Sequence, residues 1–218
     1  MHDINWVREA VARIKEDGRG NIRVHPNGFI QLDLIPVAED WHASYQKGHS
    51  GATRRLHIWN PPGFKLPHQE TVNEIHTHVF DMYSTVVRGR MEQHIYSFVV
   101  GSEWHLHRSK IPRPPIKLYK AVYAKSGDSR LEDTGILGVM IEDFSWGVHV
   151  GQTYDQPAFT FHDSDPRGCT VTVMEKVNVH EGDAYVLVPA DIEPDNSYDR
   201  ANAAPEDYLW SAVEAAIA

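Results

Sequence analysis

Hydrophobic and polar residues alternate along most of this chain, in short runs separated by turn residues. Alternation with a period of two places successive side chains on opposite faces, which is typical of β-strands with one buried face. The Asn27-Gly28 step between the first two runs predicts a hairpin, because both residues tolerate positive φ. The predicted strands include Asn21–Val24, Phe29–Ile35, Arg54–Trp59, Arg90–Phe98, Ile116–Tyr123, Cys169–Val177 and Ala184–Val188.

Two segments, one near each end of the chain, have hydrophobic residues at helical spacing instead. Between residues 3 and 17 these residues share one helical face, with Asp3 as the N-cap and Gly18 after the last turn. Glu206–Ile217 has the same amphipathic pattern. Many short strands with only two helices predict an all-β sandwich or barrel.

A chain of 218 residues is long enough for one sizeable core, and we expect a single domain over residues 1–218. Residues 1–53 form an N-terminal extension of helix and hairpin, and residues 54–190 form the barrel. A Pro-rich, charged stretch at about 101–135 is predicted to be an insertion in the barrel. Residues 191–218 are a polar tail followed by the closing helix.

The composition limits the classes of partner. The net charge is -9 and no run of Lys and Arg occurs, so nucleic acid is not an expected partner. No stretch of about 20 apolar residues is present, so we expect no membrane span. The first residues lack the features of a signal peptide, and the single cysteine, Cys169, excludes an internal disulfide. A cytoplasmic protein is the simplest interpretation.

Paired histidines provide the candidate chemistry. His76 and His78 are one residue apart among strand-forming residues, so their rings point to the same face and could converge on one metal ion. His162 offers a third ligand from a distant segment. The alternative is that these are surface residues, because the chain has 14 histidines. A second pair, His105 and His107, is the main rival for the metal pair.

These residues resemble the two metal-binding motifs of the cupin superfamily. The first motif is His-x-His, three or four residues, Glu, six residues and Gly, and His76, His78 and Gly89 have this spacing. The second motif places a Gly, a Pro and a His in order, as Gly151, Pro157 and His162 do. The resemblance implies a double-stranded β-helix, or jelly-roll barrel, with short N- and C-terminal helices. The sequence departs from the motifs at Glu70, Met82, Phe159 and Pro166.

The departure at Met82 matters most, because this residue stands where the motif glutamate would bind metal. Three neutral imidazoles would leave a divalent ion its full charge and several open positions. This pattern resembles the thiol dioxygenase branch of the cupins, the cysteine and cysteamine dioxygenases, and so implies Fe(II), with Zn, Ni or Mn as alternatives. Met82 is expected to form an apolar wall, and Asp81 is a candidate for orienting a histidine ligand.

Three further residues are candidates for catalytic roles. In the thiol dioxygenases an arginine on a strand before the first motif binds the substrate carboxylate. Arg54 or Arg55 lies in that region, and we take Arg55 as the candidate. His94 and Tyr96 share one face of the strand after Gly89. On the inner face they would flank the metal as hydrogen-bonding or proton-transfer groups, whereas on the outer face they would belong to a half-polar surface. The sequence leaves both placements open.

Three functions are consistent with these patterns. The first is an Fe(II) dioxygenase of a small molecule, for which a thiol is one candidate. The second is a non-oxidative isomerase, lyase or hydrolase that uses the metal as a Lewis acid. The third is a cupin that binds a small molecule without catalysis. The analogy with cupins, which often dimerise through their strands, adds a homodimer to the expectations.

Overall fold

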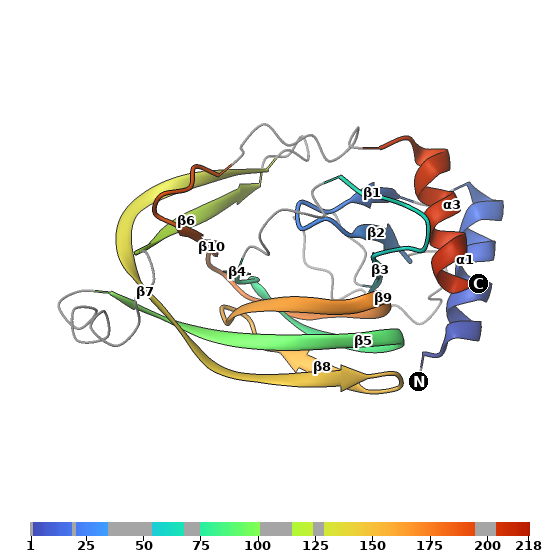
Figure 1. Ribbon diagram of the computed structural model, residues 1–218, viewed down its shortest axis with the longest axis horizontal. Coiled ribbons are helices and arrows are strands. Elements are labelled where there is room, and N and C mark those ends of the chain that lie inside the picture. The colour runs from blue at the N-terminus through green and yellow to red at the C-terminus, as the bar shows by residue number, and fades with distance from the viewer. Residues whose placement is uncertain are drawn as a thin grey trace.

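The computed structural model describes residues 2–18, 21–34, 54–67, 75–100, 115–123, 129–194 and 204–218. These residues form one antiparallel sheet with a helix near each end of the chain (Figure 1). The helices are α1 (Ile4–Asp17) and α3 (Glu206–Ile217). The strands are β1 (Ile22–Val24), β2 (Ile30–Asp33), β3 (Arg54–Trp59), β4 (Ile75–His76), β5 (Phe80–Val100), β6 (Ile116–Tyr123), β7 (Ser129–His149), β8 (Thr153–Gln156), β9 (Phe161–Val179) and β10 (Ala184–Pro189).

The two predicted helices are confirmed and lie side by side at one end of the sheet (Figure 1). The side chain of Asp3 accepts a hydrogen bond from the backbone N–H of Trp6 at 2.9 Å, which caps the first helix. Gly18 ends that helix with a φ of 62°, a conformation that glycine adopts at low cost. Within the described residues, neither helix is both long and apolar enough to cross a membrane.

Alternation along β3 separates two hydrophobic clusters. Leu56 and Ile58 pack with the helices in the first cluster, while Trp59 points the other way into a second. We call the face that carries this second cluster the inner face. Its buried members are Phe29, Trp59, Met82, Val86, Met91, Val148, Tyr154 and Met174.

The long strands β5 and β9 form the centre of the sheet. Their pairing shifts register between Arg88 and Arg90, where Gly89 has a φ of 79° and a side chain would meet the carbonyl oxygen of Cys169 at 2.4 Å. The turn predicted at 163–168 is wrong, because β9 runs through these residues and pairs Asp163 with His94. Residues 163–167 stay in register with β5, and only residues 168–170 fall at the irregularity, so the partner strand holds these turn-forming residues in the sheet.

The strand order is β1-β2-β3-β9-β4-β10-β6-β7-β5-β8, and an additional pairing joins β9 to β5. β6 has the predicted bounds, whereas β7 begins at Ser129, within the stretch predicted as an insertion. These pairings establish an all-β fold with two short helices. The closure of the sheet into a jelly-roll barrel stays a prediction.

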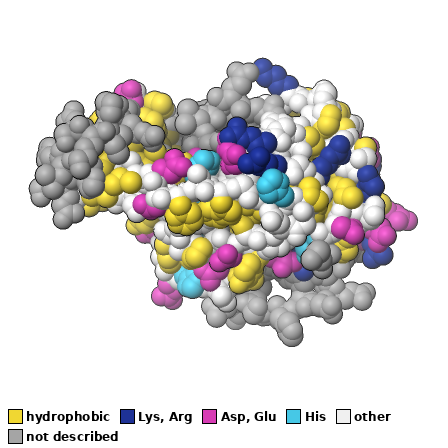
Figure 2. Space-filling model, turned by 60° about the horizontal axis from the view of Figure 1, so that its bottom comes forward, with side chains coloured by type: hydrophobic (Ala, Val, Ile, Leu, Met, Phe, Trp, Pro, Cys, Tyr) yellow, Lys and Arg dark blue, Asp and Glu magenta, His cyan; other side chains and the backbone are white. Residues whose placement is uncertain are grey.

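Apolar side chains are exposed on β7, among them Ile136, Leu137 and Phe144. On the face shown in Figure 2, hydrophobic side chains gather in bands among charged residues, and the coloured basic side chains lie in separate groups. This face therefore presents no continuous basic surface among the residues that the structure describes. The homodimer stays a prediction.

Candidate metal centre

Two neighbouring strands and the turn after one of them bring the three predicted histidines together. His76 on β4 lies directly opposite His162 on β9. Thr77 is turned away, because its N–H donates to the carbonyl oxygen of Tyr185 at 2.8 Å and its hydroxyl accepts from the N–H of Tyr185 at 2.9 Å. The carbonyl oxygen of His78 accepts from the N–H of Phe159 at 2.7 Å, which fixes the chain beyond β4.

The three imidazoles are close enough to share one ion. The ring centroids of His76 and His78 are 4.7 Å apart, those of His76 and His162 4.8 Å, and those of His78 and His162 5.1 Å. One nitrogen from each ring lies within 4.8 Å of the other two. Small side-chain rotations reduce such separations to the roughly 3–3.5 Å between ligands with metal bonds of about 2.1 Å.

Burial favours the neutral form of the His78 and His162 imidazoles. His162 is 3% exposed, and burial lowers the pKa of its ring well below the usual value, with a further contribution from His76. Burial also lowers the pKa of His78, helped by the charges of His76, His162 and Lys176. A neutral imidazole carries the lone pair that binds a metal, and protonation does not compete for it at neutral pH.

The nitrogens of His162 lack hydrogen-bond partners among the described residues. A buried polar atom left in this state costs free energy, so native proteins rarely tolerate one without a ligand or water. A metal ion would satisfy one nitrogen of each ring at once. The donor set of three imidazoles fits a divalent transition metal.

Met82 and Asp81 lie at the start of β5, directly after Phe80, whose ring stacks on His78. Met82 is buried in the second hydrophobic cluster, as an apolar wall requires. The carboxylate of Asp81 accepts hydrogen bonds from the N–H of Ala158 at 2.8 Å and the side chain of Asn178 at 3.1 Å, and contacts His180 at 3.2 Å. The N–H of Ala158 is the main cause of its lowered pKa. These contacts hold a turn in place and orient none of the three histidines.

Arg54 and Arg55 lie on opposite faces of β3, which answers the question that the sequence left open. Arg54 contacts Glu175 at 2.6 Å and stacks on Trp6 of the first helix. Arg55 alternates with Leu56 and so lies on the inner face, where it contacts Asp33 at 3.3 Å. Arg55 is therefore already held by a buried carboxylate.

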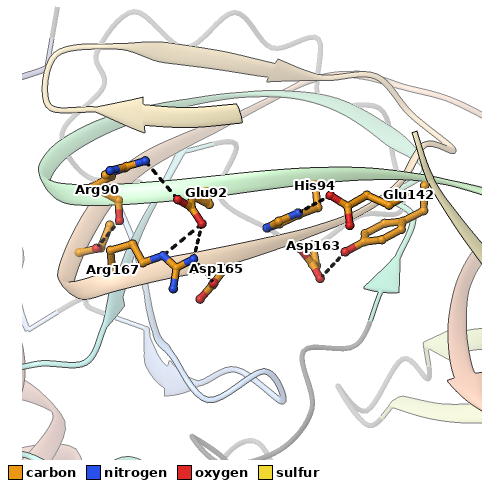
Figure 3. Close-up of polar contacts among 9 residues, drawn as sticks. Arg90, Glu92, His94, Glu142, Asp163, Asp165 and Arg167 are labelled. Atoms are coloured by element: carbon orange, nitrogen blue, oxygen red, sulfur yellow. Dashed lines mark hydrogen bonds and ion pairs between the residues drawn. The ribbon is translucent and has the colours of Figure 1, made fainter. Parts of the chain in front are cut away.

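His94 and Tyr96 lie on the opposite face of the sheet from His162. Figure 3 shows His94 on β5 close to Glu142 and Asp163. Residues directly opposite in an antiparallel pair share a face, and His162 is opposite Ile95, one residue from both of them. His94 contacts Glu142 at 3.2 Å, and the hydroxyl of Tyr96 donates to Asp163 at 3.0 Å. Both side chains therefore lie on the half-polar outer face of β5, which we call the outer stripe. This placement does not support the roles at the metal that were proposed for them.

A second group of metal-binding residue types, Glu92, His94 and Asp165, lies along the same outer stripe. Glu92 is bonded to Arg167 and, at 3.1 Å, to Arg90 (Figure 3). The hydrogen bond from Arg167 lowers the pKa of Glu92. Because the arginines already neutralise this carboxylate, the group is poorly suited to a cation. The rival pair His105 and His107 lies outside the described residues.

Sequence reasoning missed Lys176 and Gln156, which flank Met82 on β9 and β8. The Nζ of Lys176 lies 4.3 Å from the ring centroid of Phe80, and burial lowers its pKa to about 7. Gln156 is 1% exposed, and neither atom of its amide has a partner in the described part of the chain. The alternation of Thr170, Thr172 and Met174, extended by two residues, would have placed Lys176 on the inner face.

No protein-family model and no curated protein matches this chain. A Drosophila melanogaster CENP-C structure bound to CAL1 is similar over 78% of this chain and 98% of that chain, at 7% identity and a TM-score of 0.35. A hydroquinone 1,2-dioxygenase from Sphingomonas sp. TTNP3 with bound 4-hydroxybenzoate has 7% identity and a TM-score of 0.28, covering 57% of this chain and 59% of that chain.

Hydroquinone 1,2-dioxygenase PnpCD, in complex with Cd2+ and 4-hydroxybenzonitrile, has 10% identity and a TM-score of 0.28, with 60% of this chain and 61% of that chain covered. This chain thus spans about three-fifths of the length of each dioxygenase chain. At these identities and TM-scores, the likenesses assign neither a fold nor an activity to this protein.

Proposed function

We propose that this protein is a metal-dependent cupin in which His76, His78 and His162 bind a divalent ion. The proposal includes closure of the sheet as a jelly-roll barrel, which the motif spacing and the all-β fold support. The observation that carries it is the cluster of three imidazoles in which His162 is buried with neither ring nitrogen partnered. A purely structural histidine in such a place would need a hydrogen-bond partner.

We further propose that the metal is Fe(II) and that the protein is a dioxygenase of a small molecule, with a thiol as one candidate substrate. Fe(II) bound by three neutral imidazoles would supply redox chemistry toward O2 and a strong attraction for an anionic donor. The chain itself would hold the metal through the histidines. Phe80, stacked on His78 at 4.7 Å, and Met82 would provide apolar surfaces beside the site.

Metal analysis by mass spectrometry tests the site. The experiment compares wild-type protein with His162→Ala and with His94→Ala, whose histidine lies on the other face. Stoichiometric metal in wild type and His94→Ala, but not in His162→Ala, is expected. Retention of metal by His162→Ala, or absence of metal from reconstituted wild type, would overturn the proposed site.

The identity of the metal and oxygen uptake separate the two kinds of reaction. Iron together with oxygen consumption in the presence of small thiols supports the dioxygenase. Zinc that is lost in His162→Ala, without oxygen consumption after reconstitution with iron, would keep the metal site and overturn the dioxygenase. A Lewis-acid reaction would then be the function to test.

A further inference from the structure

Three side chains form a row across the sheet beside the histidines. Lys176 of β9 and Gln156 of β8 are each directly opposite Met82 of β5. Directly opposite residues share a face and have Cβ atoms about 4.5–5.5 Å apart. A cation and an amide therefore flank the position where the cupin motif has a carboxylate.

Lys176 is largely buried, and the described residues place no carboxylate within ion-pair distance of its Nζ. Asp33 attracts it at longer range, but that carboxylate is bound by Arg23 at 3.2 Å and Arg55 at 3.3 Å. Both arginines repel the ammonium. Lysine is rarely buried without a paired charge, so this arrangement favours an anion from outside the chain.

Gln156 gives a second, independent reason to expect a ligand beside Met82. Its amide is buried, and both its oxygen and its nitrogen lack a partner in the described structure. Leaving a buried amide unsatisfied is costly, whereas a bound molecule could accept a hydrogen bond from its nitrogen. The two side chains that flank Met82, on β8 and β9, thus offer a positive charge and a hydrogen-bond donor on the same face of the sheet.

Phe80 connects this row to the histidines. The Nζ of Lys176 lies 4.3 Å from the Phe80 ring centroid, and the His78 ring stacks on Phe80 with centroids 4.7 Å apart. The charge of Lys176 also contributes to the lowered pKa of His78. One small molecule could therefore reach the row and the three histidines together.

We infer that the substrate of this site carries a carboxylate that pairs with Lys176 and accepts a hydrogen bond from the amide nitrogen of Gln156. The inference rests on the proposed metal site and adds the substrate class. It also assigns the anion to Lys176 in place of Arg55, because Arg55 is held by Asp33. Arg55 contributes a positive charge that lowers the pKa of Lys176.

Binding of two matched thiols to cobalt-loaded protein tests the inference. Mercaptoacetate carries the carboxylate, and 2-mercaptoacetamide replaces it with a neutral group of similar size. The sulfur-to-cobalt absorption band reports binding of either thiol in a titration. We expect wild type to bind mercaptoacetate at least about tenfold more tightly, which corresponds to about 1.4 kcal/mol.

Variants identify the residues responsible. Lys176→Met should abolish the preference for the carboxylate, and Gln156→Leu should reduce it, while both keep the cobalt spectrum. Lys120→Met should leave it unchanged, because Lys120 contacts Asp183 at 2.8 Å and lies on the other face of the sheet from His76. Equal affinity of wild type for the two thiols, or a preference that survives Lys176→Met, would overturn the inference and leave the proposed metal site standing. A wild type that takes up no cobalt would overturn the proposed function and the inference with it.

Discussion

Replacing Lys176 with methionine should stabilise the protein. The ammonium is largely buried near Arg55 and Arg23, and burial is the main cause that lowers its pKa from 10.5 to about 7. Methionine keeps a straight side chain against Phe80 and removes the charge. The structure thus predicts that a residue assigned to ligand binding costs stability in the free protein.

The magnitude follows from the two pKa values. One pH unit of difference corresponds to about 1.4 kcal/mol, so a change from 10.5 to about 7 corresponds to about 5 kcal/mol. Between these pH values the unfolded chain binds a proton at Lys176 that the folded chain does not, so the contribution of this group to stability rises with pH. The advantage of Lys176→Met should therefore be about 5 kcal/mol at pH 6, where the cost is full, and about 2 kcal/mol at pH 9.

Urea denaturation of metal-free protein at pH 6, 7.5 and 9 measures this difference. Lys120→Met is the matched control, because its hydrogen bond to Asp183 raises the pKa of that lysine and its removal should bring no gain. A gain for Lys176→Met that shrinks as the pH rises supports the reasoning. A loss of stability, or a gain that is equal at all three pH values, would refute it.

Three further outcomes are expected. Gly89→Ala should lower the free energy of unfolding by about 3 kcal/mol in the urea titration, because φ is 79° and the new Cβ meets the Cys169 carbonyl. Gly63→Ala is the control, and because open space surrounds this residue the change should cost only about 1 kcal/mol. Met82→Glu should pair with Lys176 and raise the affinity for metal, as competition with a chelator would show; an unchanged affinity would contradict this placement. Cobalt at about 100 times its Kd should stabilise wild type by about 2.7 kcal/mol, and a chelator should reverse the rise in Tm; no shift would contradict metal binding.

The elements predicted best from the sequence are those with strong local signals. β3, β6 and α3 have the predicted bounds because their hydrophobic patterns continue to their ends. The convergence of the three histidines was also predicted, since side chains on either side of Thr77 share a face and the cupin spacing points to His162, whereas their binding of a metal stays a prediction. Both the local hydrophobic pattern and the spacing of the histidines can be read directly from the sequence.

Long-range pairing decided the features that the sequence did not show. A run of turn-forming residues continued β9 because their partners lie on β5, which no local pattern reveals. The alternation that grouped His94 with Tyr96 could not tell which face meets the core, and only the register opposite His162 settles this. Lys176 was overlooked because a lysine in an alternating strand is normally a surface residue.

The most direct test of the metal centre is anomalous X-ray diffraction from crystals of the cobalt-loaded protein, measured at the cobalt edge. We predict one strong peak among the imidazoles of His76, His78 and His162, absent from crystals of His162→Ala. A peak beside Glu92 and His94, or no peak at the three histidines, would contradict the central claim.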